Sequence, residues 1–111
     1  MQKDDNVYLH HILDAILRIE SYLSGVSKEQ FLENGLLQDG VVRQLEVIGE
    51  ASRNLSDEFQ ESHPEVPWGE IVGLRNRIVH AYFKIDFKVA WDIARDDLPS
   101  LKKQVSRFLE E

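Results

Sequence analysis

Apolar side chains recur at three- and four-residue intervals over most of the chain, the spacing that gathers them on one face of an α-helix. The first such pattern predicts a long amphipathic helix over residues 5 to 24, with Asp4 or Asp5 as its N-cap and Gly25 at its end. Its core-facing positions are Leu9, Ile12, Ile16, Ile19 and Leu23.

Two further patterns follow in the first half. Ser27 and Gln30 have the spacing of a capping box, which predicts a short helical turn closing near Asn34 and Gly35. A second long helix is expected to follow. Its apolar positions are Leu37, Val41, Leu45, Ile48 and Leu55. Gly49 in its middle costs about 1 kcal/mol relative to Ala, so we expect another backbone to pack closely there.

The middle of the chain predicts a helical turn over residues 56–62, a proline-bounded loop over 63–67 and a helix over 68–83. That last helix carries two apolar stripes. One holds Ile71, Leu74 and Ile78, and the other holds Val72, Val79 and Phe83. A surface helix of a monomer needs one stripe, so the second predicts burial against an internal neighbour or a second subunit.

Residues 83–89 alternate between apolar and polar, as a strand does, but the spacing downstream favours a helix over residues 87–109. The apolar positions are Phe87, Trp91, Ala94, Leu98, Leu101, Val105 and Phe108. Pro99 should break or kink this helix. The patterns together predict an all-α bundle of four main helices with short extras.

The composition indicates one domain spanning residues 1–111, since 111 residues suffice for a single core. No cysteine is present, which excludes disulfides and thiolate chemistry. No apolar run is long enough to cross a bilayer, so we expect a cytoplasmic protein without a membrane partner. We expect no metal and no cofactor.

The formal net charge of −7 would repel a polyanion at long range, so any affinity for nucleic acid must be local. Residues 74–88 have a net charge of +3, because Arg75, Arg77, Lys84 and Lys88 stand against Asp86 alone. The rest of the chain carries 9 basic and 19 acidic side chains.

This basic window also holds the candidate chemistry, in Arg75, Asn76, His80 and Tyr82. Arginine offers a fixed fork of donors for a phosphate, and histidine can exchange a proton near neutral pH, so the set suits phosphodiester chemistry without a metal. On a continuous helix Asn76 and His80 would be neighbours, and Arg75 would lie between the apolar stripes near Tyr82.

A purely structural alternative stays open: a helical dimerisation module in which Arg75 pairs with Glu46 or Glu50. The other polar groups favour no site. His10 and His11 are adjacent and diverge on a helix, and the carboxylates of Asp92, Asp96 and Asp97 have no second ligand set.

Residues 75–82, Arg-Asn-Arg-Ile-Val-His-Ala-Tyr, resemble the Arg-x4-6-His motif of the HEPN superfamily, in the form found in HepT-like toxins. Residues 45–51, 63–68, 85–86, 91 and 97–99 also have the character of this family. The resemblance implies a homodimeric HEPN-type bundle acting as a metal-independent endoribonuclease. Arg75 would bind the scissile phosphate, His80 would act as acid or base for attack by the ribose 2′-hydroxyl, and Asn76 would orient either group.

The resemblance further implies a toxin of a type VII toxin–antitoxin system, neutralised by an MntA-like nucleotidyltransferase that adds AMP to Tyr82. A bulky anion there would compete for the place of the substrate phosphate. An alternative of another class is a catalytically silent binding subunit for such a nucleotidyltransferase.

Overall fold

A computed structural model describes residues 3–79 and 84–111, and these residues are mostly helical. The helices are α1 (Lys3–Leu23), α2 (Lys28–Leu32), α3 (Gly35–Arg53), α4 (Asp57–Ser62), α5 (Trp68–Val72), α6 (Leu74–Ile78), α7 (Phe87–Asp92), the π-helical segment η2 (Ile93–Asp97) and α8 (Leu98–Glu110). The described ranges contain no β-strand, so the all-α prediction is confirmed. No described helix combines the length and apolar character needed to cross a bilayer.

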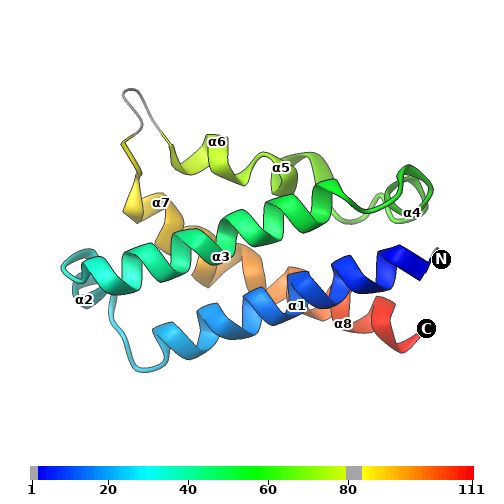
Figure 1. Ribbon diagram of the computed structural model, residues 1–111. Coiled ribbons are helices and arrows are strands. Elements are labelled where there is room, and N and C mark those ends of the chain that lie inside the picture. The colour runs from blue at the N-terminus through cyan, green and yellow to red at the C-terminus, as the bar shows by residue number, and fades with distance from the viewer. Residues whose placement is uncertain (1–2, 80–83) are drawn as a thin grey trace.

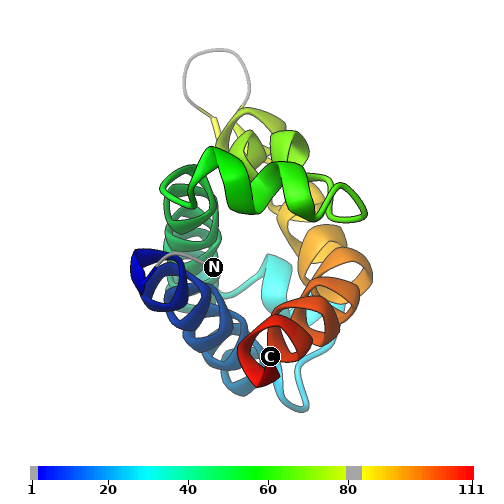
Figure 2. The ribbon, with the colours of Figure 1, turned by 90° about the vertical axis from the view of Figure 1, so that its right-hand side faces the viewer.

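Three rods frame the molecule: α1, α3 and the continuous run from α7 through η2 to α8 (Figure 1). Helix α3 runs antiparallel along α1, and α8 packs on α1 as well. Helices α5 and α6 lie over α3 as a fourth, shorter layer, as the end-on view of Figure 2 shows. The expected count of four main helices is not confirmed, because this fourth layer consists of two short helices.

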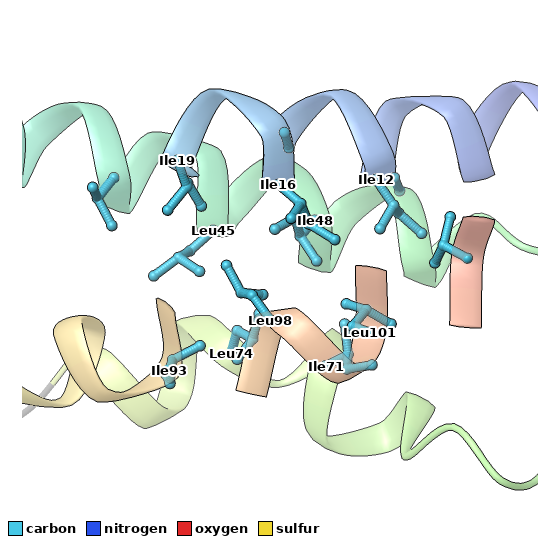
Figure 3. Close-up of a cluster of buried hydrophobic side chains, with 14 of the residues drawn as sticks. Ile12, Ile16, Ile19, Leu45, Ile48, Ile71, Leu74, Ile93, Leu98 and Leu101 are labelled. Carbon is cyan, nitrogen blue, oxygen red and sulfur yellow. The ribbon is translucent and has the colours of Figure 1, made fainter. Parts of the chain in front are cut away.

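A single hydrophobic core joins all these elements (Figure 3). Isoleucines of α1 and the buried face of α3 meet side chains of α5, α6, η2 and α8 from the opposite side. The labelled members are Ile12, Ile16, Ile19, Leu45, Ile48, Ile71, Leu74, Ile93, Leu98 and Leu101.

Most of the predicted boundaries are confirmed by their caps. Ser27 and Gln30 form both hydrogen bonds of the capping box at the start of α2, and Gly25 adopts the left-handed φ of 72° after α1. The side chain of Asn34 caps α3, and that of Ser56 caps α4.

The close approach expected at Gly49 is present. A Cβ atom at this position would lie 3.2 Å from the carbonyl oxygen of Ile71 and 3.5 Å from that of Val72. Glycine therefore lets the backbone of α5 rest directly on α3. This contact fixes the distance between α5 and α3, and it thereby positions α6, which follows α5 directly.

The prediction of one helix over residues 68–83 is wrong. The helix is interrupted at Gly73, with φ −86° and ψ 11°, and α6 ends at Ile78 because Val79 is extended, with φ −101° and ψ 120°. Val79 forms an isolated antiparallel bridge with Ile85. The strand-like alternation of residues 83–89 therefore corresponds to a single extended pairing at Ile85.

The helix predicted over residues 87–109 forms, with an irregularity close to Pro99. The segment η2 takes the wider π-helical turn immediately before α8, and Pro99 lies in the first turn of α8, where its missing N–H costs least. The expected break is therefore absorbed as a π segment, without a gap between helices.

Asp5 has a different role from the N-cap that the sequence suggested. It lies inside the first turn of α1 and is 1% exposed. Its carboxylate accepts hydrogen bonds from the backbone N–H of Ser56 at 2.7 Å and from the Ser56 hydroxyl at 2.8 Å. Asp5 thus fastens the start of α4 to α1.

Replacing Gly49 with leucine should destabilise the fold by about 1–3 kcal/mol, because the side chain must displace the backbone of α5. Gly35→Leu is the matched control, since nothing lies within 4 Å of a Cβ there. Thermal unfolding of both variants tests this. Equal melting temperatures would contradict the close crossing.

Truncation of Asp5 to alanine should cost about 1–3 kcal/mol, because it leaves the N–H of Ser56 without its acceptor in a partly buried position. Asp4→Ala, an exposed carboxylate one residue away, serves as the control. Urea unfolding should separate the two variants, and an Asp4 variant as unstable as the Asp5 variant would refute the proposed fastening.

Candidate active site

The candidate motif begins on α6, a helix that buries one edge and exposes the rest. Leu74 and Ile78, one turn apart, are 3% and 1% exposed and lie in the core. Arg75, Asn76 and Arg77 between them are exposed. The five-residue helix therefore works as a short platform that presents three consecutive polar side chains to solvent.

A tight corner at Gly73 places this platform after α5. The N–H of Gly73 donates to the carbonyl of Gly69, and the carbonyl of Gly73 accepts from the N–H groups of Asn76 and Arg77. A Cβ atom at position 73 would lie 3.2 Å from the carbonyl oxygen of Gly69. The corner thus joins two short helices with backbone hydrogen bonds alone.

The far end of α6 is closed by backbone contacts with the start of α7. The N–H of Asp86 donates to the carbonyl of Ile78 at 2.6 Å, beside the bridge between Val79 and Ile85. The Asp86 carboxylate then caps α7 by accepting from the N–H groups of Lys88 and Val89. Residues 85 and 86, just before α7, therefore contact the C-terminal end of α6.

His80 and Tyr82, the other two predicted site residues, lie outside the described residues. Their angular positions were predicted from a helix continuing to Phe83, and that premise fails because α6 ends at Ile78. On either side of the undescribed residues, Val79 and Ile85 pair with each other next to the end of α6.

Arg75 is not held between apolar stripes, as the sequence suggested, but is exposed. Within the described residues, no ion pair links it to Glu46 or Glu50; the carboxylate of Glu50 lies 3.9 Å from the guanidinium of Arg53 instead. The internal pairing on which the purely structural alternative depended is therefore absent. Among the residues that the structure describes, the exposed guanidinium of Arg75 forms no ion pair.

A contact between the platform and η2 was not predicted from the sequence. The Nη2 atom of Arg77 donates to Oδ2 of Asp97 at 3.3 Å. A cavity of about 300 Å³ opens beside this pair, between α5 and α6 on one side and η2 and α8 on the other. The only sign of this contact in the sequence is the run of carboxylates on the last helix, which the sequence suggested as a possible cation site. In the described part of the chain no cluster of metal-ligating side chains is found.

The exposed cations of this region are Arg75 and Arg77 on α6 and Lys84 and Lys88 near the start of α7. An exposed guanidinium can donate two parallel hydrogen bonds to a phosphate, and the amide of Asn76 can donate or accept beside it. The exposed side chains of Arg75 and Asn76 are thus of the chemical types that bind anions.

Comparisons with known proteins point to one family. A family model described as "Ribonuclease HepT-like" matches residues 12–108. A protein of Thermococcus cleftensis named "Probable ribonuclease HepT" is 41% identical over 97% of this chain and 98% of its own length. No solved structure matches the chain.

Two relatives from Methanocaldococcus jannaschii are each 38% identical. One, named "Putative RNase MJ1380", is covered over 95% of its length by 94% of this chain. The other is named "Gamma-glutamylcyclotransferase and putative RNase MJ0434", and this chain, matched in full, spans 50% of that protein.

Proposed function

This chain belongs to the HepT-like ribonuclease family, and on that premise we propose that it is a metal-independent RNA endonuclease. The observation that carries the proposal is the exposed pair Arg75 and Asn76 on a helix anchored by buried Leu74 and Ile78. Arg75 has no acidic partner among the described residues, so its charge is free to bind a phosphate of the RNA backbone.

The chemistry follows from the residue types. His80 takes the proton of a ribose 2′-hydroxyl, the 2′-oxygen attacks the adjacent phosphorus, and the bond to the 5′-oxygen of the next nucleotide breaks. The leaving oxygen takes up a proton, so the products end in a cyclic phosphate and a 5′-hydroxyl. Arg75 offsets the charge that grows on the phosphate, and Asn76 orients the phosphate or the imidazole.

A homodimer is part of this proposal. Val72 and Val79, members of the second apolar stripe, are only half-buried in the single chain, which leaves apolar surface beside the platform for a second subunit. In such a dimer the two motifs would face a shared groove that holds one RNA strand.

We further assign the enzyme to the toxin side of a type VII toxin–antitoxin system, in which an MntA-like nucleotidyltransferase adds AMP to Tyr82. The adduct would add a phosphate seven residues after Arg75 in the same motif, and this phosphate would compete with RNA for Arg75. The catalytically silent binding subunit remains the second candidate, and the overall charge of −7 favours it, because this field opposes RNA at long range.

Purified protein should cleave single-stranded RNA in the presence of EDTA. Arg75→Ala should lower kcat/KM by about 10²- to 10³-fold, because it removes a charge that stabilises the transition state. His80→Ala should cost about 10²- to 10⁴-fold through loss of proton transfer. Gel analysis of a labelled oligonucleotide, with identification of the cyclic phosphate, gives the measurement.

Arg107→Ala is the control for these variants, since it removes an exposed arginine from α8 and should leave cleavage unchanged. Cleavage that survives both motif substitutions would assign the activity to a contaminant or another site. A wild-type protein without cleavage would favour the silent binding subunit.

Co-expression with an MntA-like nucleotidyltransferase should add the mass of one or more AMP groups to the intact protein and reduce its cleavage activity. Tyr82→Phe should remove the adduct, because phenylalanine lacks the acceptor oxygen, while Tyr8→Phe should retain it. An adduct that persists in the Tyr82 variant would contradict the assigned acceptor.

A further inference from the structure

Helix α6 is attached to the bundle along a narrow line. It has five residues and no side-chain hydrogen bond at its N-cap, so its stability depends on tertiary contacts. Its two buried side chains, Leu74 and Ile78, lie one turn apart on the same edge. These side chains resist lifting of the helix, whereas resistance to rotation about its axis has to come from the backbone contacts at its two ends and from its exposed side chains.

The two arginines of α6 lie on opposite sides of that buried edge. With about 100° between successive residues, Arg75 falls about 100° to one side of Leu74, and Arg77 falls about 60° to the other. A contact made by Arg77 therefore restrains the rotation that would redirect Arg75 and Asn76.

The ion pair with Asp97 is such a contact. It joins Nη2 of Arg77 to Oδ2 of Asp97 at 3.3 Å, with the two side chains 42% and 51% exposed. Asp97 is held in place because its neighbour Leu98 and residue Ile93 of the same π segment are buried. An exposed ion pair adds little to the free energy of unfolding. The pair does connect α6 to η2 on the side of the helix opposite Arg75.

We infer that Asp97 is a positioning residue for RNA cleavage, acting through Arg77 to fix the direction in which Arg75 meets the scissile phosphate. The inference rests on the proposed ribonuclease function. Asp97 itself touches neither the phosphate nor the reacting atoms in this role. The ion pair limits the orientations that α6 can adopt, so less entropy is lost when Arg75 is aligned with the phosphate in the transition state.

The test compares Asp97→Asn with Asp96→Asn, which removes a neighbouring exposed carboxylate of the same π segment that forms no ion pair with a described residue. Asp97→Asn should lower kcat about fivefold with a smaller change in KM and an unchanged melting temperature, whereas Asp96→Asn should match wild type. Asp97→Glu should retain most of the activity, because it can restore the pair.

A double-mutant cycle separates positioning from a structural role. If Asp97 acts through the direction of Arg75, Asp97→Asn should have little further effect on the residual activity of Arg75→Ala. The exchanged pair, Arg77→Asp with Asp97→Arg, should recover part of the kcat lost in Asp97→Asn.

Each outcome decides the inference. Cleavage by Asp97→Asn at the wild-type rate, equal losses in the Asp96 and Asp97 variants, or full additivity with Arg75→Ala would overturn it and leave the proposed function intact. Wild-type protein that fails to cleave RNA would overturn the proposed function, and the inference with it.

Discussion

The burial of Leu74 and Ile78 is the interaction on which the candidate site depends. Each of these side chains contributes about 1.5–3 kcal/mol by leaving water, and together they hold a five-residue helix that could not persist alone. The same two contacts turn Arg75, Asn76 and Arg77 outward. The packing of Leu74 and Ile78 in the core therefore also determines that the polar motif faces solvent.

Backbone contacts determine how far α6 lies from α3 and where α6 ends. At Gly49 the carbonyl groups of α5 come within van der Waals reach of α3, which fixes α5 and the following corner. At the other end, the bridge between Val79 and Ile85 brings the chain back to α6 before α7 begins. These backbone contacts hold the basic motif at a fixed position on a chain whose overall charge is −7.

Much of the fold could be predicted because its helices carry clear apolar periodicity and local caps. The capping box at Ser27 and the glycine crossing at position 49 needed only nearby residues to be recognised. The helix over residues 68–83 could not be delimited, because its apolar spacing continues past Ile78 while the actual end is set by pairing with Ile85, a tertiary contact. The Arg77–Asp97 pair spans 20 residues and leaves no local pattern.

The central claim is that RNA meets the protein at α6 through Arg75. Chemical-shift mapping with a 2′-O-methyl oligonucleotide, which cannot be cleaved because its 2′-hydroxyl is blocked, tests this most directly. The largest shifts are expected on the Arg75 side chain and on the backbone amides of residues 74–79. Shifts confined to the outer faces of α1 and α4, with the Arg75 signals unchanged, would contradict it.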